Sequence, residues 1–522
     1  MVTSPSSMAC RACKQDVQQL LSGLTEDGRI SPSVYETARV VSSLPDLPGH
    51  AARIDYLLAA QRQDGRWGPR DAGYGLIPTL SAIEALLTVQ STGRGGAQII
   101  STVQSALRGL ADVVPGAAIR LPDLPAADLV VAALVPRIDE HLTTVPLAGA
   151  TQLPTWLRDM GSHHGCRLNA LNTRLGAAAK LDDKLLHAAE TFVAGLSPGS
   201  IQPSTAGSIG ASPAATAAWL ATKPSGPGAT TARRYLAQLA HRTGGPLPCV
   251  APVAVFERAW VLNWLRHTGI PVDVPETIRR SLRGSLTDTG AATAPGLPTD
   301  ADTTSMVLAT LTLLGEPLDP SMLRAYELDT HFCTWPGEQG QSVTTNAHVL
   351  EALSLYVRAR PAERQRYLPV IRKVSSWLLD QQHDAGHWDD RWHASPYYAT
   401  FCAALALARF ADPPATPAMR STIRWLLNTQ RANGSWGIWH GTPEETAYAV
   451  HLLTQLASPR HPRYQVAIGL AKNYLDQTPR SGGQPPLWHD KDLYTPETIV
   501  DAALLTTRHC LHSAPNRQRR DH

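Results

Sequence analysis

The sequence is poor in charge and has no long apolar run. Charged residues make up 17% of its 522 residues and hydrophobic residues 43%, which is typical of a well-buried globular protein. The formal net charge of +3 is too small to indicate nucleic acid as a partner. No apolar run reaches about 18 residues, so we expect no stable membrane insertion. The opening segment lacks the basic and apolar regions of a signal peptide, which favours a cytoplasmic protein.

Cysteine and phenylalanine are also scarce. Seven cysteines with scattered spacing favour reduced thiols over a disulfide framework. Cys10 and Cys13 form a lone CxxC without the second pair of a zinc site, so a metal role for them is not favoured. Only 5 phenylalanines stand beside 13 tryptophans and 13 tyrosines. The aromatic content is therefore concentrated in electron-rich rings.

Sustained period-two alternation is absent, and helical periodicity takes its place. Apolar residues recur at i, i+3, i+4 and i+7 in seven segments, which are 35–44, 79–90, 259–269, 305–315, 346–359, 399–411 and 445–457. Proline and glycine separate these segments. We therefore predict an all-α protein.

A short turn recurs between the predicted helices. It reads "QRQDGRWG" at 61–68, "QQHDAGHW" at 381–388 and "TQRANGSWG" at 429–437, with a degenerate copy "SGGQPPLWHD" at 481–490. Glycine supplies the positive φ of a helix C-cap, the tryptophan can pack back on the helix, and the glutamine amide can bond the next turn's backbone. Repeats of this kind indicate helical hairpins arranged in a ring or a stack.

Two stretches rich in glycine, serine, proline and threonine, at 197–230 and 283–300, break the chain. We place one domain at 48–285 and a second at 286–522. We expect residues 1–47 to return with their first helix to the second domain.

Asp300 and Asp302 are crowded in "PGLPTDADTTSMVL", residues 295–308, just before an apolar helical segment. One interpretation is an N-capping pair. The other is a protonating acid. A free aspartate has a pKa of about 3.9 and is ionised at neutral pH. Two carboxyls in a dry pocket cannot both ionise, so one retains a proton with which it could protonate an alkene.

The helical segments, the repeat turns and the acid motif follow one another along nearly the whole chain in an order that resembles the class II terpene cyclases. This family includes squalene–hopene cyclases and bacterial drimenyl, halimadienyl and copalyl diphosphate synthases. The turns resemble the family's QW repeats, and "TDADTTS" resembles its Asp-x-Asp-Asp acid motif in an Asp-x-Asp-Thr-Thr variant. The resemblance implies two α/α-barrel domains, termed β and γ, with the active cavity between them. It also implies that Asp302 donates the proton, that Asp300 raises the pKa of Asp302 and that Asn346 orients the proton. Thr303 replaces the usual last aspartate, which leaves the proton-holding role mainly to Asp300.

A carbocation needs aromatic faces, which stabilise it by about 2 kcal/mol or more when desolvated. The candidate rings are Trp335, Trp388, Trp392, Tyr397, Tyr398, Trp439 and Tyr448, and for each the alternative is packing in the barrel wall. His348 and His393 are possible proton acceptors, between which the sequence does not choose.

If the substrate is a prenyl diphosphate, its diphosphate group should survive the reaction, because the sequence lacks the metal-binding motifs with which other terpene synthases ionise such a group. The resemblance makes Lys491 the first choice to hold it, ahead of Arg391 and Arg258. It also implies Mg²⁺ as cofactor. The acid-rich segment of many relatives is reduced here to Asp71, so we assign no metal ligands.

We therefore expect an enzyme that cyclises a linear prenyl diphosphate. The reduced acid segment and the bulky Trp335 favour farnesyl diphosphate and a drimenyl product. The alternative is geranylgeranyl diphosphate, which would give a copalyl, halimadienyl or clerodienyl type. Squalene as substrate, a non-catalytic helical-repeat binding protein and a zinc-dependent prenyltransferase subunit are further alternatives. The oligomeric state stays open.

Overall fold

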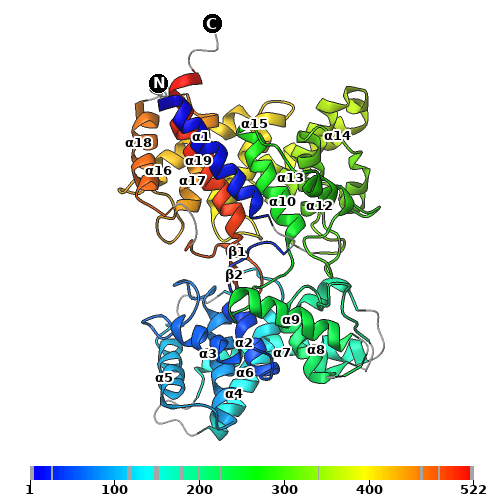
Figure 1. Cartoon of the computed structure of the whole chain (residues 1–522), viewed down its shortest axis with the longest axis vertical. Helices are drawn as coiled ribbons and strands as arrows, with labels where there is room; N and C mark the ends of the chain where they lie inside the picture. Colours follow the sequence, from blue (N-terminus) through cyan, green and yellow to red (C-terminus); the bar gives the residue numbers. More distant parts are fainter. Residues whose placement is uncertain are drawn as a thin grey trace.

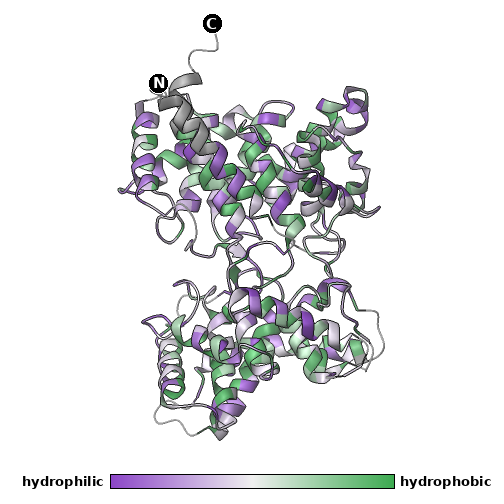
Figure 2. Ribbon diagram, viewed as in Figure 1, coloured by the Kyte–Doolittle hydropathy of each residue, from purple (hydrophilic) through white to green (hydrophobic). Residues whose placement is uncertain are grey.

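The computed structural model consists of two helical lobes joined by a narrow junction (Figure 1). It describes residues 5–24, 27–113, 120–145, 152–176, 181–196, 200–223, 225–226, 228–338, 340–458, 462–479 and 483–517. The side chains of Cys10 and Cys13 lie outside the described residues. None of the described helices is long and apolar enough to cross a membrane, and Figure 2 shows hydrophilic and hydrophobic stretches mixed along the helices of both lobes.

The C-terminal lobe contains α1 and everything from α10 onward. Its elements are α1 (Pro5–Ser22), α10 (Ala254–His267), α11 (Glu276–Gly284), α12 (Ala301–Leu313), η3 (Pro320–Tyr326), α13 (Val343–Ala359), η4 (Pro361–Glu363), α14 (Arg364–Asp380), α15 (Pro396–Phe410), α16 (Thr416–Thr429), α17 (Pro443–Leu456), α18 (Pro462–Asp476), β1 (Trp488–His489), β2 (Leu493–Tyr494) and α19 (Glu497–Arg517). Helices α10, α12, α13, α15, α17 and α19 contact one another in that order, and α19 contacts α10, which closes a ring. The lobe is therefore an α/α barrel, with helices such as α14, α16 and α18 outside the ring.

The inserted lobe contains α2 to α9. Its elements are α2 (Val34–Ser43), α3 (His50–Ala59), α4 (Leu76–Ser91), α5 (Ala97–Ala111), α6 (Ala127–Thr144), α7 (Thr155–Gly176), η1 (Asp183–Thr191), η2 (Val193–Gly195), α8 (Pro213–Thr222) and α9 (Ala229–Thr243). Here α2, α4, α6, η1 and α8 form a second, smaller ring. The expectation of an all-α protein with two barrels is confirmed, and β1 and β2 pair only as a two-residue hairpin at the junction (Figure 1).

Three QW turns tie consecutive outer helices together by the same set of bonds, joining α14 to α16, α16 to α18 and, in the inserted lobe, α3 to α5. The ring N–H of Trp388 donates to Leu378 O at 2.7 Å, and the amide of Gln382 donates to the carbonyls of Gly386 and Ala418, each at 3.1 Å. The turns at Gln61–Trp67 and Gln430–Trp436 repeat this pattern. The fourth copy does not: the ring of Trp488 donates instead to Glu444 at 2.9 Å.

The predicted domain boundaries are wrong at both ends of the inserted lobe. Helix α2 packs on α4 and α8, and of the described helices in the first 47 residues only α1 packs on a helix of the C-terminal lobe. Helix α10 belongs to the C-terminal barrel, because it packs between α12 and α19. The prediction relied on flexible composition at 283–300. The chain instead changes lobes at Pro248–Val253, where the segment is short and buried.

Candidate active site

Asp300 caps the N-terminus of α12. Its carboxylate accepts the N–H of Thr303 at 2.6 Å and the hydroxyl of Thr293 at 3.2 Å. The side chain is buried, and burial raises the pKa of Asp300 to about 7; the Thr303 hydrogen bond opposes this shift and the charge of Asp302 adds to it. The capping and the proton-holding interpretations of this residue are therefore compatible, since one carboxyl has both properties.

Asp302 lies in the first turn of α12 and is bonded to His348 of the neighbouring helix α13. The Oδ1 atom of Asp302 and the Nδ1 atom of His348 are 2.6 Å apart, and the Asp302 side chain is 18% exposed. Burial lowers the pKa of His348, but the charge of Asp302 outweighs burial, so the pKa of His348 lies well above its ordinary value. The pair therefore keeps a proton at neutral pH in contact with the predicted acid.

Asn346, the residue expected to orient this proton, does not contact Asp302. Its Oδ1 accepts the N–H of Phe332 at 2.8 Å, and its Nδ2 donates to the carbonyls of Phe332 and Ser342 at 2.9 and 2.8 Å. All of these partners belong to the backbone. Asn346 fastens the segment before α13 to the start of that helix, and His348 takes the position beside the acid.

Aromatic rings lie beside Asp302 and His348. The ring of Trp260 lies edge-on to His348 at 5.5 Å and donates its N–H to the hydroxyl of Tyr398 at 2.9 Å. Tyr398 is close enough to Asp302 for that charge to contribute to its raised pKa, of which burial is the main cause. Trp488 packs on Tyr398 with ring centroids 4.6 Å apart. Since β1 lies at the junction of the lobes (Figure 1), this end of the barrel faces the inserted lobe.

Sequence reasoning identified Tyr398 and Tyr448 in this aromatic cluster but missed Trp260 and Trp488. Tyr448 lies 5.2 Å from Tyr398. The predicted boundary at residue 285 places the segment "FERAWVLNWLRH" in the inserted domain and so excludes Trp260, although this segment has the spacing of an inner barrel helix. Trp488 belongs to the degenerate fourth repeat turn, where the repeat predicts a packing role for the ring.

Of the other predicted rings, some pack in the barrel wall. The others lie at the end of the barrel that faces the inserted lobe, here called the mouth. Trp388 is buried in its QW turn, and Tyr397 packs against Trp425 under the outer helix α16, with ring centroids 4.6 Å apart. Trp335 and Trp392 are half-buried and lie edge-on to each other at 5.3 Å. Trp439 lies edge-on at 5.5 Å to Tyr74 of the inserted lobe, so it belongs to the mouth between the lobes.

A second buried carboxylate lies across the aromatic cluster from the acid. Glu444, at the start of α17, accepts the ring N–H of Trp488 at 2.9 Å and the hydroxyl of Tyr448 at 2.8 Å. Its Oε1 lies 3.4 Å from Nε2 of His393, and its Oε2 is buried without a partner. The ring of His393 packs on Tyr398 at 4.8 Å. The predicted acid, Asp302, and the carboxylate of Glu444 therefore lie beside the same group of aromatic rings.

Lys491, the predicted diphosphate ligand, is fully buried in the junction. Its ammonium lies 2.6 Å from Glu36 and 2.9 Å from Glu190, and it donates to the carbonyl of His187 at 2.7 Å and the hydroxyl of Ser212 at 2.8 Å. These partners occupy all of its donors, and all of them come from the inserted lobe. The structure contradicts a diphosphate-binding role for Lys491, which holds the two lobes together.

The two arginine alternatives differ in position. Arg258 is buried in the barrel wall and bonds the hydroxyl of Ser281 at 2.5 Å. Arg391 lies at the mouth, where it contacts Glu338 at 3.1 Å and Asp123 of the inserted lobe at 3.2 Å, above the ring of Trp392. Of the predicted cations, only Arg391 lies where a ligand could reach it.

Behind His348 the barrel holds a narrow cavity of about 40 Å³. Its polar lining includes Glu351, which accepts from Asn263 at 2.7 Å and lies 2.6 Å from His267. Burial raises the pKa of Glu351, but its partners, His267 first, bring it to about 2. A water molecule needs roughly 10–15 Å³, so the cavity has room for a few.

Comparisons with known proteins identify the family of this chain. Residues 339–472 match the model of the squalene-hopene cyclase C-terminal domain. The chain is 41% identical to an ent-copalyl diphosphate synthase from Streptomyces sp. strain KO-3988, covering 96% of both chains. It is 39% identical to the labda-7,13-dienyl diphosphate synthase of Streptomyces clavuligerus, over 92% of this chain and 89% of the relative.

A solved structure is also similar. The ent-copalyl diphosphate synthase from Streptomyces platensis matches with a TM-score of 0.84 and 39% identity, over 96% of this chain and 98% of that one. Similarity at this level, over nearly the full length of both chains, is accompanied here by the hydrogen-bonded Asp302 and His348 beside aromatic rings. The protein therefore belongs to the class II terpene cyclases, enzymes that isomerise their substrate by cyclising it.

Proposed function

We propose that this protein converts geranylgeranyl diphosphate into a copalyl-type bicyclic diphosphate. The relatives are named for copalyl and labdadienyl diphosphates, which supports the geranylgeranyl alternative better than the farnesyl interpretation. The observation that carries the proposal is the hydrogen bond between Asp302 and His348 inside an aromatic wall. It supplies a proton donor in a place where a cation is stabilised.

The acid acts through its pairing with His348. The charge of Asp302 raises the pKa of His348 although burial opposes it, so before substrate binds His348 holds the proton of their hydrogen bond. A prenyl chain bound against the aromatic rings removes water from Asp302 and His348. Separated charges are costly in such surroundings. The proton then passes to Asp302, which donates it to the terminal double bond of the substrate.

Cyclisation follows from this single proton transfer. Two further double bonds attack in turn and form two ring carbon–carbon bonds, while the positive charge moves along the chain. The rings of Trp260, Tyr398 and Trp488 stabilise it by cation–π contact. Loss of a proton from carbon ends the reaction, so the product is an isomer of the substrate and keeps its diphosphate.

His393 is the proton acceptor that we propose for this last step. His348 is already bonded to the acid, whereas His393 lies on the other side of Tyr398, and its Nδ1 takes the proton when it releases the N–H of Ser395, which it accepts at 3.0 Å. Glu444, 3.4 Å from Nε2 of His393, stabilises the imidazolium that forms. Water in the cavity behind His348 then returns a proton to the acid for the next turnover.

The diphosphate binds at the mouth in this proposal, beside Arg391. Mg²⁺ is usually held by one or two carboxylates together with substrate phosphates. Asp71 and Asp123 of the inserted lobe fit this requirement, because both lie close enough to Tyr74 to contribute to its raised pKa, of which burial is the main cause. Mg²⁺ bound there with the substrate would neutralise diphosphate charge, and Arg391 would orient the head group.

The proposal is tested by product analysis. Purified protein is incubated with Mg²⁺ and, separately, with farnesyl and geranylgeranyl diphosphate, with Asp302→Asn in parallel. We expect a bicyclic C20 alcohol that appears only after phosphatase treatment and is absent for the variant. A bicyclic product from farnesyl diphosphate alone would restore the drimenyl interpretation. Linear alcohols from both substrates would refute prenyl diphosphate cyclisation.

A further inference from the structure

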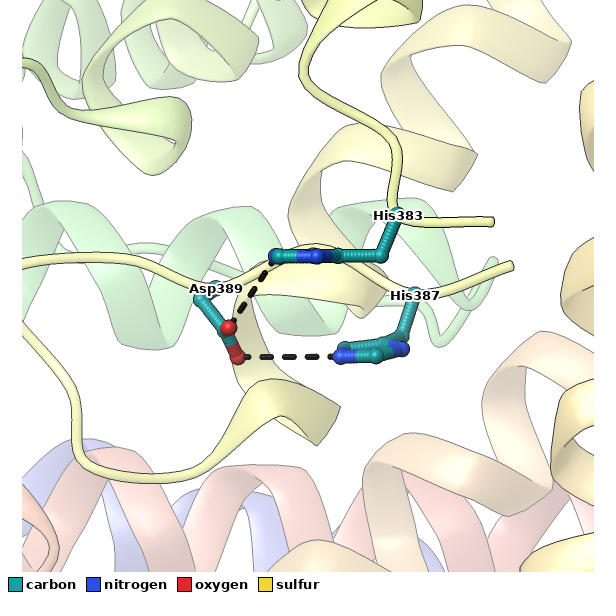
Figure 3. A group of neighbouring side chains, drawn as sticks. All are labelled: His383, His387 and Asp389. Atoms are coloured by element: carbon teal, nitrogen blue, oxygen red, sulfur yellow. Dashed lines mark ion pairs between the residues drawn. The ribbon is translucent and has the colours of Figure 1, made fainter. Parts of the chain in front are cut away.

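The QW turn between α14 and α15 holds two histidines and an aspartate that the cyclisation chemistry does not use. The rings of His383 and His387 are stacked with centroids 4.6 Å apart and planes 10° apart. The Nε2 atom of His383 lies 3.1 Å from Oδ2 of Asp389, and Nε2 of His387 lies 4.0 Å from Oδ1 of the same carboxylate. Figure 3 shows both rings pointing their Nε2 edges toward Asp389.

The turn itself brings the two rings together. The N–H of His383 donates to the carbonyl of His387 at 2.9 Å, and Gly386 between them has a φ of +102°, which closes the turn. The buried Trp388 and the amide of Gln382 fix the two ends of this segment. On its outer side, the ring of His387 stacks on Trp425 at 5.2 Å. The donors are thus held by a structural element, not by a free loop.

The other two QW turns have the same backbone with different side chains. The corresponding backbone bond joins Arg62 to Arg66 in the first turn and Arg431 to Ser435 in the third, each at 2.9 Å. In the first turn these two positions carry arginines, and both arginines form ion pairs with Asp64. Among the described residues, only the turn at 383–389 gathers three groups that could hold a metal ion.

His387 is poorly explained without a further ligand. Its Nε2, the atom that faces Asp389, lies 4.0 Å from the carboxylate, which is too long for a hydrogen bond. Three donor atoms that converge within 4.8 Å match a tetrahedral ion, whose ligand atoms are about 3.3 Å apart when the bonds are about 2.0 Å. Because the two rings are stacked with planes 10° apart, their in-plane lone pairs are nearly parallel, so one ring must tilt toward the other before both imidazoles and the carboxylate reach one ion.

We propose that His383, His387 and Asp389 bind a divalent transition metal of the zinc class, with solvent completing the coordination. Two imidazoles and one carboxylate suit Zn²⁺ and Co²⁺, whereas Mg²⁺ prefers oxygen donors. The site is therefore chemically distinct from the Mg²⁺ that accompanies the diphosphate. Asp389 precedes Asp390, which accepts from Ser342 and Thr344 at the start of α13, so a bound ion would fasten this turn to an inner helix.

The test uses the full-length protein, purified without a histidine tag and stripped of metal. Zn²⁺ alone is titrated by calorimetry, and Co²⁺ alone is followed by its visible absorption. The variants are His383→Ala and Asp389→Asn, whose side chains are 51% and 61% exposed, so folding should be retained. The matched control is His163→Ala/His164→Ala in α7, another surface pair with rings 5.1 Å apart that belongs to no three-residue group among the described residues.

We expect one Zn²⁺ per chain, a tetrahedral Co²⁺ spectrum and a rise of the unfolding temperature with Zn²⁺. Either site variant should weaken binding by more than about tenfold, whereas the control should bind like wild type. Absence of binding, or equal binding by His383→Ala and wild type, would overturn the proposal. Loss of binding in the control would move the site to α7. No measurement here depends on the cyclase activity, so the two proposals fail independently.

Discussion

Replacing Lys491 by methionine distinguishes the junction clamp from a diphosphate ligand. The variant leaves Glu36 and Glu190 buried without their cation. Removal of one partner of a buried pair costs roughly 3–5 kcal/mol, because the remaining charge is neither solvated nor paired. The pKa of Glu36 is already raised to about 7 by burial, against the charge of Lys491. Without the lysine, Glu36 takes up a proton at neutral pH, which keeps the loss toward the lower end of that range.

The measurement is urea unfolding at pH 7, followed by tryptophan fluorescence and circular dichroism, whose midpoint reports the change in the free energy of unfolding. Lys472→Ala is the matched control. Lys472 pairs with Asp476 at i, i+4 but is 39% exposed, so its loss should cost no more than about 0.5 kcal/mol. The double variant Glu36→Gln/Lys491→Met should recover part of the stability, since an amide in place of Glu36 needs neither the lysine nor the uptake of a proton.

The opposite outcome is equally clear. If Lys491→Met unfolds with the same midpoint as wild type while its KM for the prenyl diphosphate rises tenfold, the ammonium binds the head group and the junction clamp is refuted. We expect the reverse: a lower midpoint, with little change in KM for the protein that remains folded. Arg391→Ala should instead raise KM, because that guanidinium lies at the mouth.

Three further predictions concern the acid and the base. His348→Ala should lower the single-turnover rate constant by about 10²-fold or more, since it removes the group that delivers the proton, and it should also lower the midpoint of unfolding, since it leaves Asp302 without its partner; an unaltered rate constant would exclude that role. The folded pKa of Asp300, about 7, exceeds its ordinary 3.8, so its protonation stabilises the fold fully below about pH 4, and this contribution disappears as the pH rises through 7. Asp300→Asn should flatten the pH dependence of the urea midpoint over that range, and an unchanged slope would argue against a protonated Asp300. Glu444→Gln should divert part of the product to a hydroxylated diphosphate, heavier by one water, because the cation persists when His393 is a weaker base; an identical product profile by mass spectrometry would exclude the pair as the terminating base.

The helices and the repeat turns were predictable from the sequence because their causes are local. Apolar spacing fixes which residues enter a helix, and glycine with tryptophan fixes the turn, so three of the four QW copies appear as expected. The acid motif was equally visible, since Asp300 and Asp302 are separated by one residue. The family follows from the order of such local features along the chain.

The partner of the acid could not be found in this way. Asn346 and His348 are two residues apart on α13, so they point about 200° apart around the helix. Either face can be turned toward α12, and only the packing of the complete ring decides which one is. The ring places His348 beside Asp302 and turns Asn346 to the backbone of Phe332 and Ser342.

The position of Lys491 shows the same limit over a longer range. Its sequence neighbours are aspartates, which suits both a ligand site and a buried clamp. The residues that decide are Glu36 and Glu190, which lie hundreds of positions earlier and reach it only because the chain leaves the C-terminal lobe, builds the inserted lobe and returns. The sequence alone thus determined the helices, the turns and the acid motif, because these depend on neighbours in the chain. Only the tertiary structure decided which polar groups meet, because burial and pairing depend on neighbours in space.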